Sequence, residues 1–115
     1  MLAPGPAKKV TVYVDENVRH RGEPLYVTVL NYLFRHDVSG ATVTKGVAGF
    51  GAHHQIHTSR ILEASERLPI KIEFIETPSK IDQLMPELLG IVVDGLVEVQ
   101  DTTIVKSTGV KPAGR

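Results

Sequence analysis

Hydrophobic side chains occupy every second position in two stretches of the chain. Valines recur in this way over residues 10–14, and apolar residues do the same over residues 70–74, with polar or aromatic residues between them. A period of two is typical of a strand that buries one face. We also predict strands over residues 41–47 and 96–105, which makes four strands in all.

Two other stretches repeat their hydrophobic residues at the spacing of a helix. The first runs from Pro24, which the first turn of a helix tolerates, to His36. The second follows Thr77, a predicted N-cap, and extends over residues 78–92. Pro86 lies inside this second helix, so we expect a bend or one missing hydrogen bond there.

The predicted order of elements is β-α-β-β-α-β, the ferredoxin-like arrangement of an α+β fold. A four-stranded antiparallel sheet would be covered on one face by both helices. We expect one domain over residues 9–106, with flexible segments at residues 1–8 and 107–115 that are rich in small residues, Gly and Pro. The other face of the sheet should be solvated or meet another subunit. Alternation assigns to that face Thr11, Tyr13, Thr42, Thr44, Lys71 and Glu73.

Composition excludes several classes of protein. The 13 basic and 13 acidic residues give zero net charge, so we expect no nucleic-acid partner. The chain has no cysteine, which excludes disulfides, zinc–thiolate sites and thiol catalysis. No apolar run reaches the roughly 18 residues of a membrane span, and the first residues do not resemble a signal peptide. We therefore expect a cytoplasmic location.

The segment between the second and third strands, residues 48–67, is about 20 residues long. Structureless loops of that length are uncommon in compact domains and usually have a function. The segment opens with Gly-Phe-Gly at residues 49–51, where glycines allow main-chain N–H groups to approach a ligand. A plain turn at the end of a strand is the alternative interpretation of these glycines. Residues 56–66 are compatible with a short helix.

Three histidines in the same segment suggest a metal site as an alternative. His53 and His57 are four residues apart, which on a helix would place both imidazoles on one face, and His54 lies between them. No cysteine joins them, and the spacing reveals no further ligand. Catalysis would need a nucleophile and a base held together in a pocket. His57 with Thr58 or Ser59 has no identifiable third member, so we do not expect an enzyme.

Several short motifs together resemble the PII nitrogen-regulatory signalling family. They are Ser-Gly-Ala-Thr-Val-Thr at residues 39–44, Gly-Phe-Gly at 49–51, His-Thr at 57–58 and Leu-Pro-Ile-Lys-Ile-Glu at 68–73. The chain is more similar still to an uncharacterised PII-like branch from bacteria and archaea. The hallmarks of that branch look like Gly-Val-Ala-Gly-Phe-Gly at 46–51, Ile-His-Thr-Ser-Arg-Ile-Leu at 56–62 and Asp-Gly-Leu-Val at 94–97. The resemblance covers roughly residues 9–105.

The resemblance implies a homotrimer with an adenine nucleotide in each cleft between subunits, and no tightly bound cofactor. The loop over residues 48–67 would change shape and contact a partner, either a membrane transporter or an enzyme. Residues near the base of this loop and in the turn before the last strand would bind the ligand. By position these residues are Thr42, Lys45, Gly49, Phe50, Gly51, His57, Thr58, Arg60, Glu73, Asp94 and Gly95.

Three departures from the PII pattern bear on the ligand. Leu96 follows the Asp-Gly turn where PII proteins have a lysine, and residues 101–105 lack the two arginines that grip phosphates, with only Lys106 nearby. The loop is also shorter and has no tyrosine. A triphosphate needs several cations to offset its charge. We therefore expect a mono- or diphosphate or another small anion, with Lys45 and Arg60 as compensating cations.

Two other interpretations stay open. The histidine cluster would suit a trimeric metal-binding protein that resembles the copper-tolerance proteins sharing this architecture. A structural oligomer without any ligand is the remaining alternative.

Overall fold

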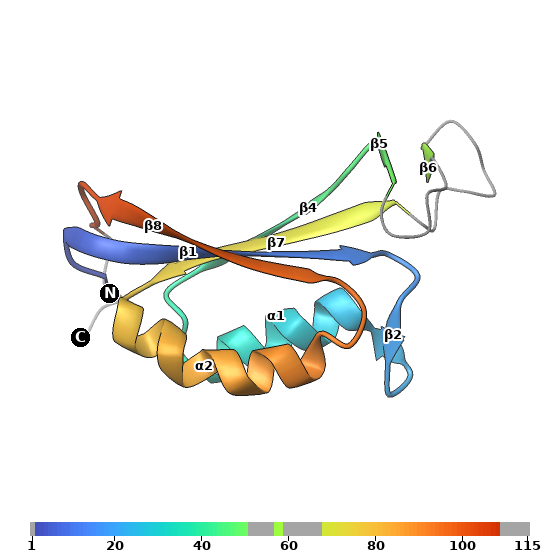
Figure 1. Ribbon diagram of the computed structural model, residues 1–115, viewed down its shortest axis with the longest axis horizontal. Coiled ribbons are helices and arrows are strands. Elements are labelled where there is room, and N and C mark those ends of the chain that lie inside the picture. The colour runs from blue at the N-terminus through green and yellow to red at the C-terminus, as the bar shows by residue number, and fades with distance from the viewer. Residues whose placement is uncertain (1, 51–56, 59–67, 109–115) are drawn as a thin grey trace, which may run out of the picture.

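The computed structural model describes residues 2–50, 57–58 and 68–108. Four of its strands form one sheet in the order β4-β7-β1-β8, and every neighbouring pair is antiparallel. Both helices lie on one face of this sheet (Figure 1). The predicted α+β ferredoxin-like fold is therefore confirmed. The elements are β1 (Gly5–Asp15), β2 (Arg19–His20), β3 (Glu23–Pro24), α1 (Leu25–Arg35), β4 (Ala41–Lys45), β5 (Ala48–Gly49), β6 (His57–Thr58), β7 (Pro69–Glu76), α2 (Pro78–Ile91) and β8 (Leu96–Ile104).

Some boundaries differ from those that the hydrophobic pattern predicts. Strand β1 begins at Gly5 because its first residues pair along the far end of β8, where Gly5 is opposite Ile104. Small residues and lysines carry no alternating hydrophobic signal there, so the pattern starts only at Val10. The polar stretch after β1 also contains a short hairpin, β2–β3. Its turn is formed by Arg21 and Gly22, whose φ angles of 52° and 87° match the left-handed region that tight hairpin turns use.

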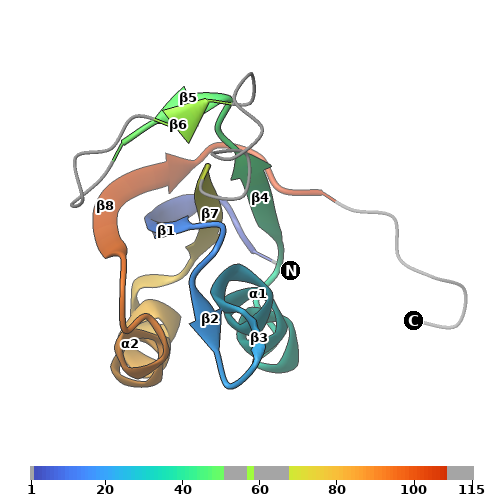
Figure 2. The ribbon, with the colours of Figure 1, turned by 90° about the vertical axis from the view of Figure 1, so that its right-hand side faces the viewer.

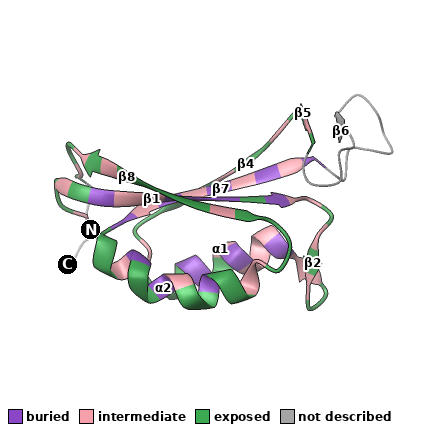
Figure 3. Cartoon of the chain, in the orientation of Figure 1, coloured by how far each residue is buried: buried purple, intermediate pink, exposed green. Residues whose placement is uncertain are grey.

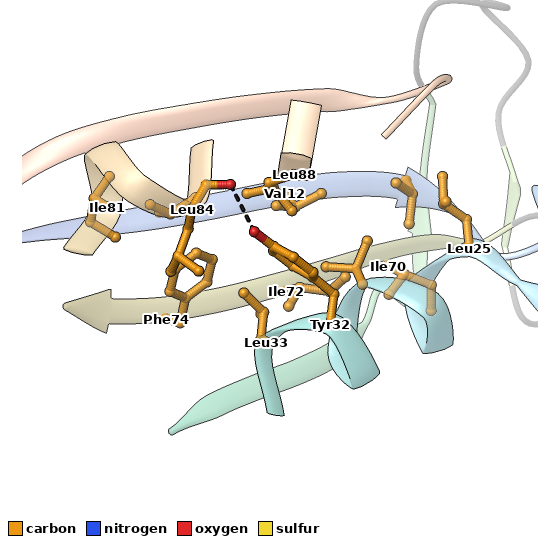
Figure 4. Packing of buried hydrophobic residues seen from close by; sticks show 13 residues of the cluster. Val12, Leu25, Tyr32, Leu33, Ile70, Ile72, Phe74, Ile81, Leu84 and Leu88 are labelled. Carbon is orange, nitrogen blue, oxygen red and sulfur yellow. Dashed lines mark hydrogen bonds between the residues drawn. The ribbon is translucent and has the colours of Figure 1, made fainter. Parts of the chain in front are cut away.

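The hydrophobic core lies between the sheet and the two helices (Figures 3 and 4). Alternate residues of β1 and β7 point toward the helices, and the apolar stripes of α1 and α2 cover them, as the periodicities predict. Strand β8 is an edge strand and contributes less to the core. The core residues are Val10, Val12, Val14, Leu25, Val29, Tyr32, Leu33, Ile70, Ile72, Phe74, Ile81, Leu84 and Leu88.

Helix α2 has the predicted N-cap and tolerates its internal proline. The Thr77 hydroxyl accepts a hydrogen bond from the backbone N–H of Lys80 at 3.3 Å, and Pro86 faces solvent. A polar contact inside the core joins this helix to α1. The buried Tyr32 hydroxyl donates to the carbonyl oxygen of Leu84 at 3.0 Å (Figure 4). Burial also raises the pKa of Tyr32 above the ordinary value of a tyrosine hydroxyl.

Replacing this hydroxyl should weaken the contact between the two helices. We expect Tyr32→Phe to lower the free energy of unfolding by about 1 kcal/mol, the usual net value of a buried hydrogen bond. Tyr26→Phe on the same helix is the matched control, and its effect should stay within about 0.5 kcal/mol. Chemical denaturation of both variants at one protein concentration measures the difference. Equal losses in the two variants would contradict a specific role for the Tyr32 hydroxyl.

Candidate functional site

Backbone hydrogen bonds hold together the two arms of the loop between β4 and β7. The N–H of Gly46, which follows β4, donates to the carbonyl of Pro69 at 2.8 Å. On the returning arm the carbonyl of Leu68 accepts from the N–H of Glu16 at 3.0 Å. The base of the loop is therefore fixed to the end of β1 and the start of β7.

Beyond this base the chain forms a second, smaller sheet. Ala48 is opposite Thr58 and Gly49 is opposite His57 in the antiparallel pair β5–β6. Residues 56–66 are compatible in sequence with a short helix, but the structure corrects this at His57 and Thr58, whose backbones pair with β5. The rest of that predicted helix lies outside the described residues.

Two glycines on the departing arm pack against the ring of Pro69. A Cβ atom at Gly46 would lie 2.8 Å from Pro69 Cγ, and one at Gly49 would lie 3.1 Å from the same atom. Such distances are shorter than ordinary carbon contacts, so both positions favour glycine for packing reasons. Gly49 thus has a structural role in addition to the ligand contact that we predicted for it. The next residue, Phe50, exposes 63% of its surface.

The ammonium group of Lys45 forms an ion pair at the base of the loop. Lys45 Nζ lies 2.9 Å from Glu16 Oε2. This pair joins the end of β4 to the residue that follows β1. The cation that we predicted as a phosphate ligand is therefore paired with a carboxylate of its own chain.

The Asp94–Gly95 turn sits against the end of the central strand. A Cβ atom at Gly95 would lie 2.5 Å from the carbonyl oxygen of Tyr13 and 2.8 Å from Val14 Cγ1. Only glycine permits this close approach, so Gly95 is required by packing. Asp94 is exposed beside it.

Thr42 and Glu73 are cross-strand partners on the sheet face that the helices leave uncovered. The Glu73 carboxylate lies 3.0 Å from Lys71 Nζ and 3.5 Å from Lys9 Nζ. The hydrogen bond from Lys71, aided by the charge of Lys9, lowers the pKa of Glu73, and the same hydrogen bond raises the pKa of Lys71. Thr11, on the same face by register, is only 3% exposed.

A cavity of about 500 Å³ opens at the far end of this uncovered face. Lys9, Thr42 and Glu73 line it together with the turn that precedes β4. This cavity lies away from the base of the loop, because Thr42 is three residues before Lys45 along β4, or roughly 10 Å.

Among the described residues, the predicted binding residues at the loop base and those in the turn before β8 lie on different strands of the sheet. Strands β4 and β8 are the two edges of the main sheet (Figure 2). Lys45 ends β4 and Gly95 directly precedes β8, and both lie at the end of the sheet where β1 finishes. Three strand spacings of about 4.8 Å put these edges roughly 14 Å apart. Gly51 and Arg60 lie outside the described residues, as do His53 and His54 of the metal alternative.

Over residues 2–50, 57–58 and 68–108, no group of three or more His, Cys, Asp or Glu side chains is placed to hold a metal ion. The metal alternative stays a prediction, because two of its histidines are not described. Neither helix in this part of the chain is long and apolar enough to cross a membrane.

The sheet order, the two helices on one face and the long loop between β4 and β7 define a PII-like fold. The chain belongs to the DUF190 family, described as "Uncharacterized ACR, COG1993", whose model matches residues 7–104. It is 31% identical over 101 residues to the UPF0166 protein MJ1524 of Methanocaldococcus jannaschii, covering 87% of this chain and 93% of that one. The predicted membership of an uncharacterised family is thus confirmed, and the solved structures described next show that its fold is PII-like.

Solved structures share the fold at low sequence identity. CPII of Thiomonas intermedia K12, a nitrogen regulatory PII-like protein bound to ADP, AMP and bicarbonate, superposes with a TM-score of 0.62 and 19% identity, covering 92% of this chain and 94% of that one. The putative PII-like signaling protein TTHA0516 of Thermus thermophilus gives a TM-score of 0.65 and 17% identity, with coverages of 90% and 94%.

Sequence reasoning missed Glu16. It lies in a polar stretch that the periodicity assigns to a loop, and neither Lys45 nor Leu68 is near it in sequence. Its contacts arise only when β1, β4 and β7 are paired, so no local signal could have found them. An acidic residue directly after a buried strand is a weak hint at most.

The packing of Gly95 leads to a test of its structural role. We expect Gly95→Ala to lower the free energy of unfolding by about 1–3 kcal/mol, because the added methyl group would collide with the Tyr13 backbone. Gly90→Ala is the control: nothing lies within 4 Å of its Cβ position, and alanine in a helix should be neutral or stabilising by up to about 1 kcal/mol. Thermal unfolding of both variants distinguishes them. A Gly95→Ala protein as stable as Gly90→Ala would contradict the close approach.

Proposed function

We propose that this protein is a PII-like regulator that binds an adenine mono- or diphosphate in clefts between copies of itself. The observation that carries the proposal is the division of the predicted site between opposite edges of one sheet. One edge offers the base of the loop, and the other offers the Asp94–Gly95 turn. A trimer that brings the first edge of one copy against the second edge of the next would complete the site three times.

The ligand class follows from the fold and from the charges at this end of the sheet. Structures with this fold include CPII bound to ADP and AMP, which supports an adenine nucleotide. Phosphates need cations or several N–H donors. Lys45 is the described cation of the predicted site at the loop base, and one cation favours few phosphates over three.

The loop over residues 48–67 is the proposed responsive element. Backbone hydrogen bonds between Gly46 and Pro69 and between Glu16 and Leu68 hold the base of the loop. A ligand bound at the base would therefore contact the groups that orient the loop. A ligand shifts such a segment only if it prefers one arrangement over another. In this proposal the loop then engages or releases a partner protein, either a membrane transporter or an enzyme.

The proposal first requires the purified protein to be a trimer. We expect native mass spectrometry and light scattering at micromolar concentration to give a mass of about three chains, since each site needs two edges. A monomer under these conditions would overturn the proposal, because the two halves of the site would never meet.

Binding itself can be tested at Gly49. We expect calorimetric titration to detect ADP or AMP binding to the wild type, and Gly49→Val to weaken that binding at least about tenfold by blocking the backbone. Gly40→Val is the control, because nothing lies within 4 Å of the Gly40 Cβ position at the opposite end of β4.

Melting temperature and trimer mass should be measured for both variants, because a side chain at Gly49 also meets Pro69. Unchanged affinity in Gly49→Val would rule out backbone contact at this position. Loss of affinity together with loss of the trimer would point to a packing defect instead of a lost ligand contact.

A further inference from the structure

Glu16 contacts both arms of the loop between β4 and β7. Its side chain holds Lys45 on the departing arm at 2.9 Å, and its backbone N–H donates to Leu68 on the returning arm at 3.0 Å. Leu68 is 2% exposed, so this point of the base is well packed. Glu16 therefore links the two arms, so a movement of either arm would change a contact that Glu16 makes with the other.

The two oxygens of the Glu16 carboxylate have different surroundings. Oε2 receives the Lys45 ammonium group, while Oε1 is buried and has no hydrogen-bond partner among the described residues. A buried oxygen without a donor is costly, so the carboxylate depends on Lys45 for its stabilisation. Removing Lys45 from this pair would leave an uncompensated, partly buried charge. The Glu16 side chain is 25% exposed and that of Lys45 is 47% exposed, so the ammonium group is the more accessible partner.

These contacts make Lys45 available to a phosphate only in competition with Glu16. We propose that Glu16 sets the affinity of the loop base for phosphorylated ligands by holding Lys45 in an ion pair that the ligand must break. This inference rests on the proposed function, and it adds a residue that opposes binding. A ligand phosphate would take the ammonium group, and Glu16 would lose its partner beside the point where the loop returns to β7.

The competition has a specific dependence on ligand charge. A diphosphate attracts the ammonium group more strongly than a monophosphate, and an uncharged nucleoside does not attract it. A purely structural ion pair would show no such dependence, because its loss would affect folding regardless of the ligand. Varying the number of phosphates on the ligand therefore distinguishes competition for Lys45 from a purely structural ion pair.

The test is a double-mutant cycle on Glu16→Gln and Lys45→Gln, titrated with ADP, AMP and adenosine. We expect Glu16→Gln to bind ADP roughly two- to fivefold more tightly than the wild type, the range for a partly exposed ion pair. The gain should be smaller for AMP and absent for adenosine. Lys45→Gln should bind ADP more weakly, and the double variant should bind as Lys45→Gln does, because Glu16 acts only through Lys45.

Two further measurements keep the outcome unambiguous. Glu87→Gln removes the same charge from the exposed side of α2 and should leave ADP affinity unchanged, which controls for net charge. Melting temperatures show whether Glu16→Gln, which keeps the side-chain shape, has altered the fold. Wild-type binding without a gain in Glu16→Gln, or an equal gain in the Lys45→Gln background, would overturn this inference alone. No nucleotide binding by any of the proteins would overturn the proposed function and this inference with it.

Discussion

The pairing of β1 with both of its neighbours is the constraint on which the structure depends. Val10, Val12 and Val14 are at most 3% exposed and fix which face of the central strand meets the helices. A slip of one residue in either pairing would turn these valines toward the other face. The register therefore determines which residues are neighbours at the end of β1. Leu96 of β8 lies opposite Tyr13, and Pro69 of β7 lies opposite Asp15.

The backbone is closely packed at that end of the sheet. Gly95 lies against the Tyr13 backbone, while Gly46 and Gly49 lie against the ring of Pro69. The Gly46 N–H at the loop base donates to the Pro69 carbonyl, and Lys45 is paired with the Glu16 carboxylate.

The periodic segments could be predicted from the sequence, and the site could be predicted only in part. The valines of β1, the alternation in β7 and the stripe of α2 gave the right elements and the right fold because each buries one face independently of its partners. Strand β1 extends to Gly5 and His57 lies in a strand because of pairing with distant segments, which periodicity does not encode. The glycines at residues 46, 49 and 95 are visible in the sequence as parts of motifs. The sequence does not show that packing against Pro69 and Tyr13 requires glycine at these positions.

The sequence by itself determined the alternation of buried and exposed positions, the order of strands and helices, and membership of a PII-like branch. Those properties are local, or are carried by motifs whose residues are adjacent in the chain. Only the tertiary structure decided that the two halves of the predicted site lie on opposite edges of the sheet, and that Lys45 is held by Glu16. Both depend on contacts between segments far apart in sequence, and their geometry exists only after the backbone hydrogen bonds of the sheet have formed.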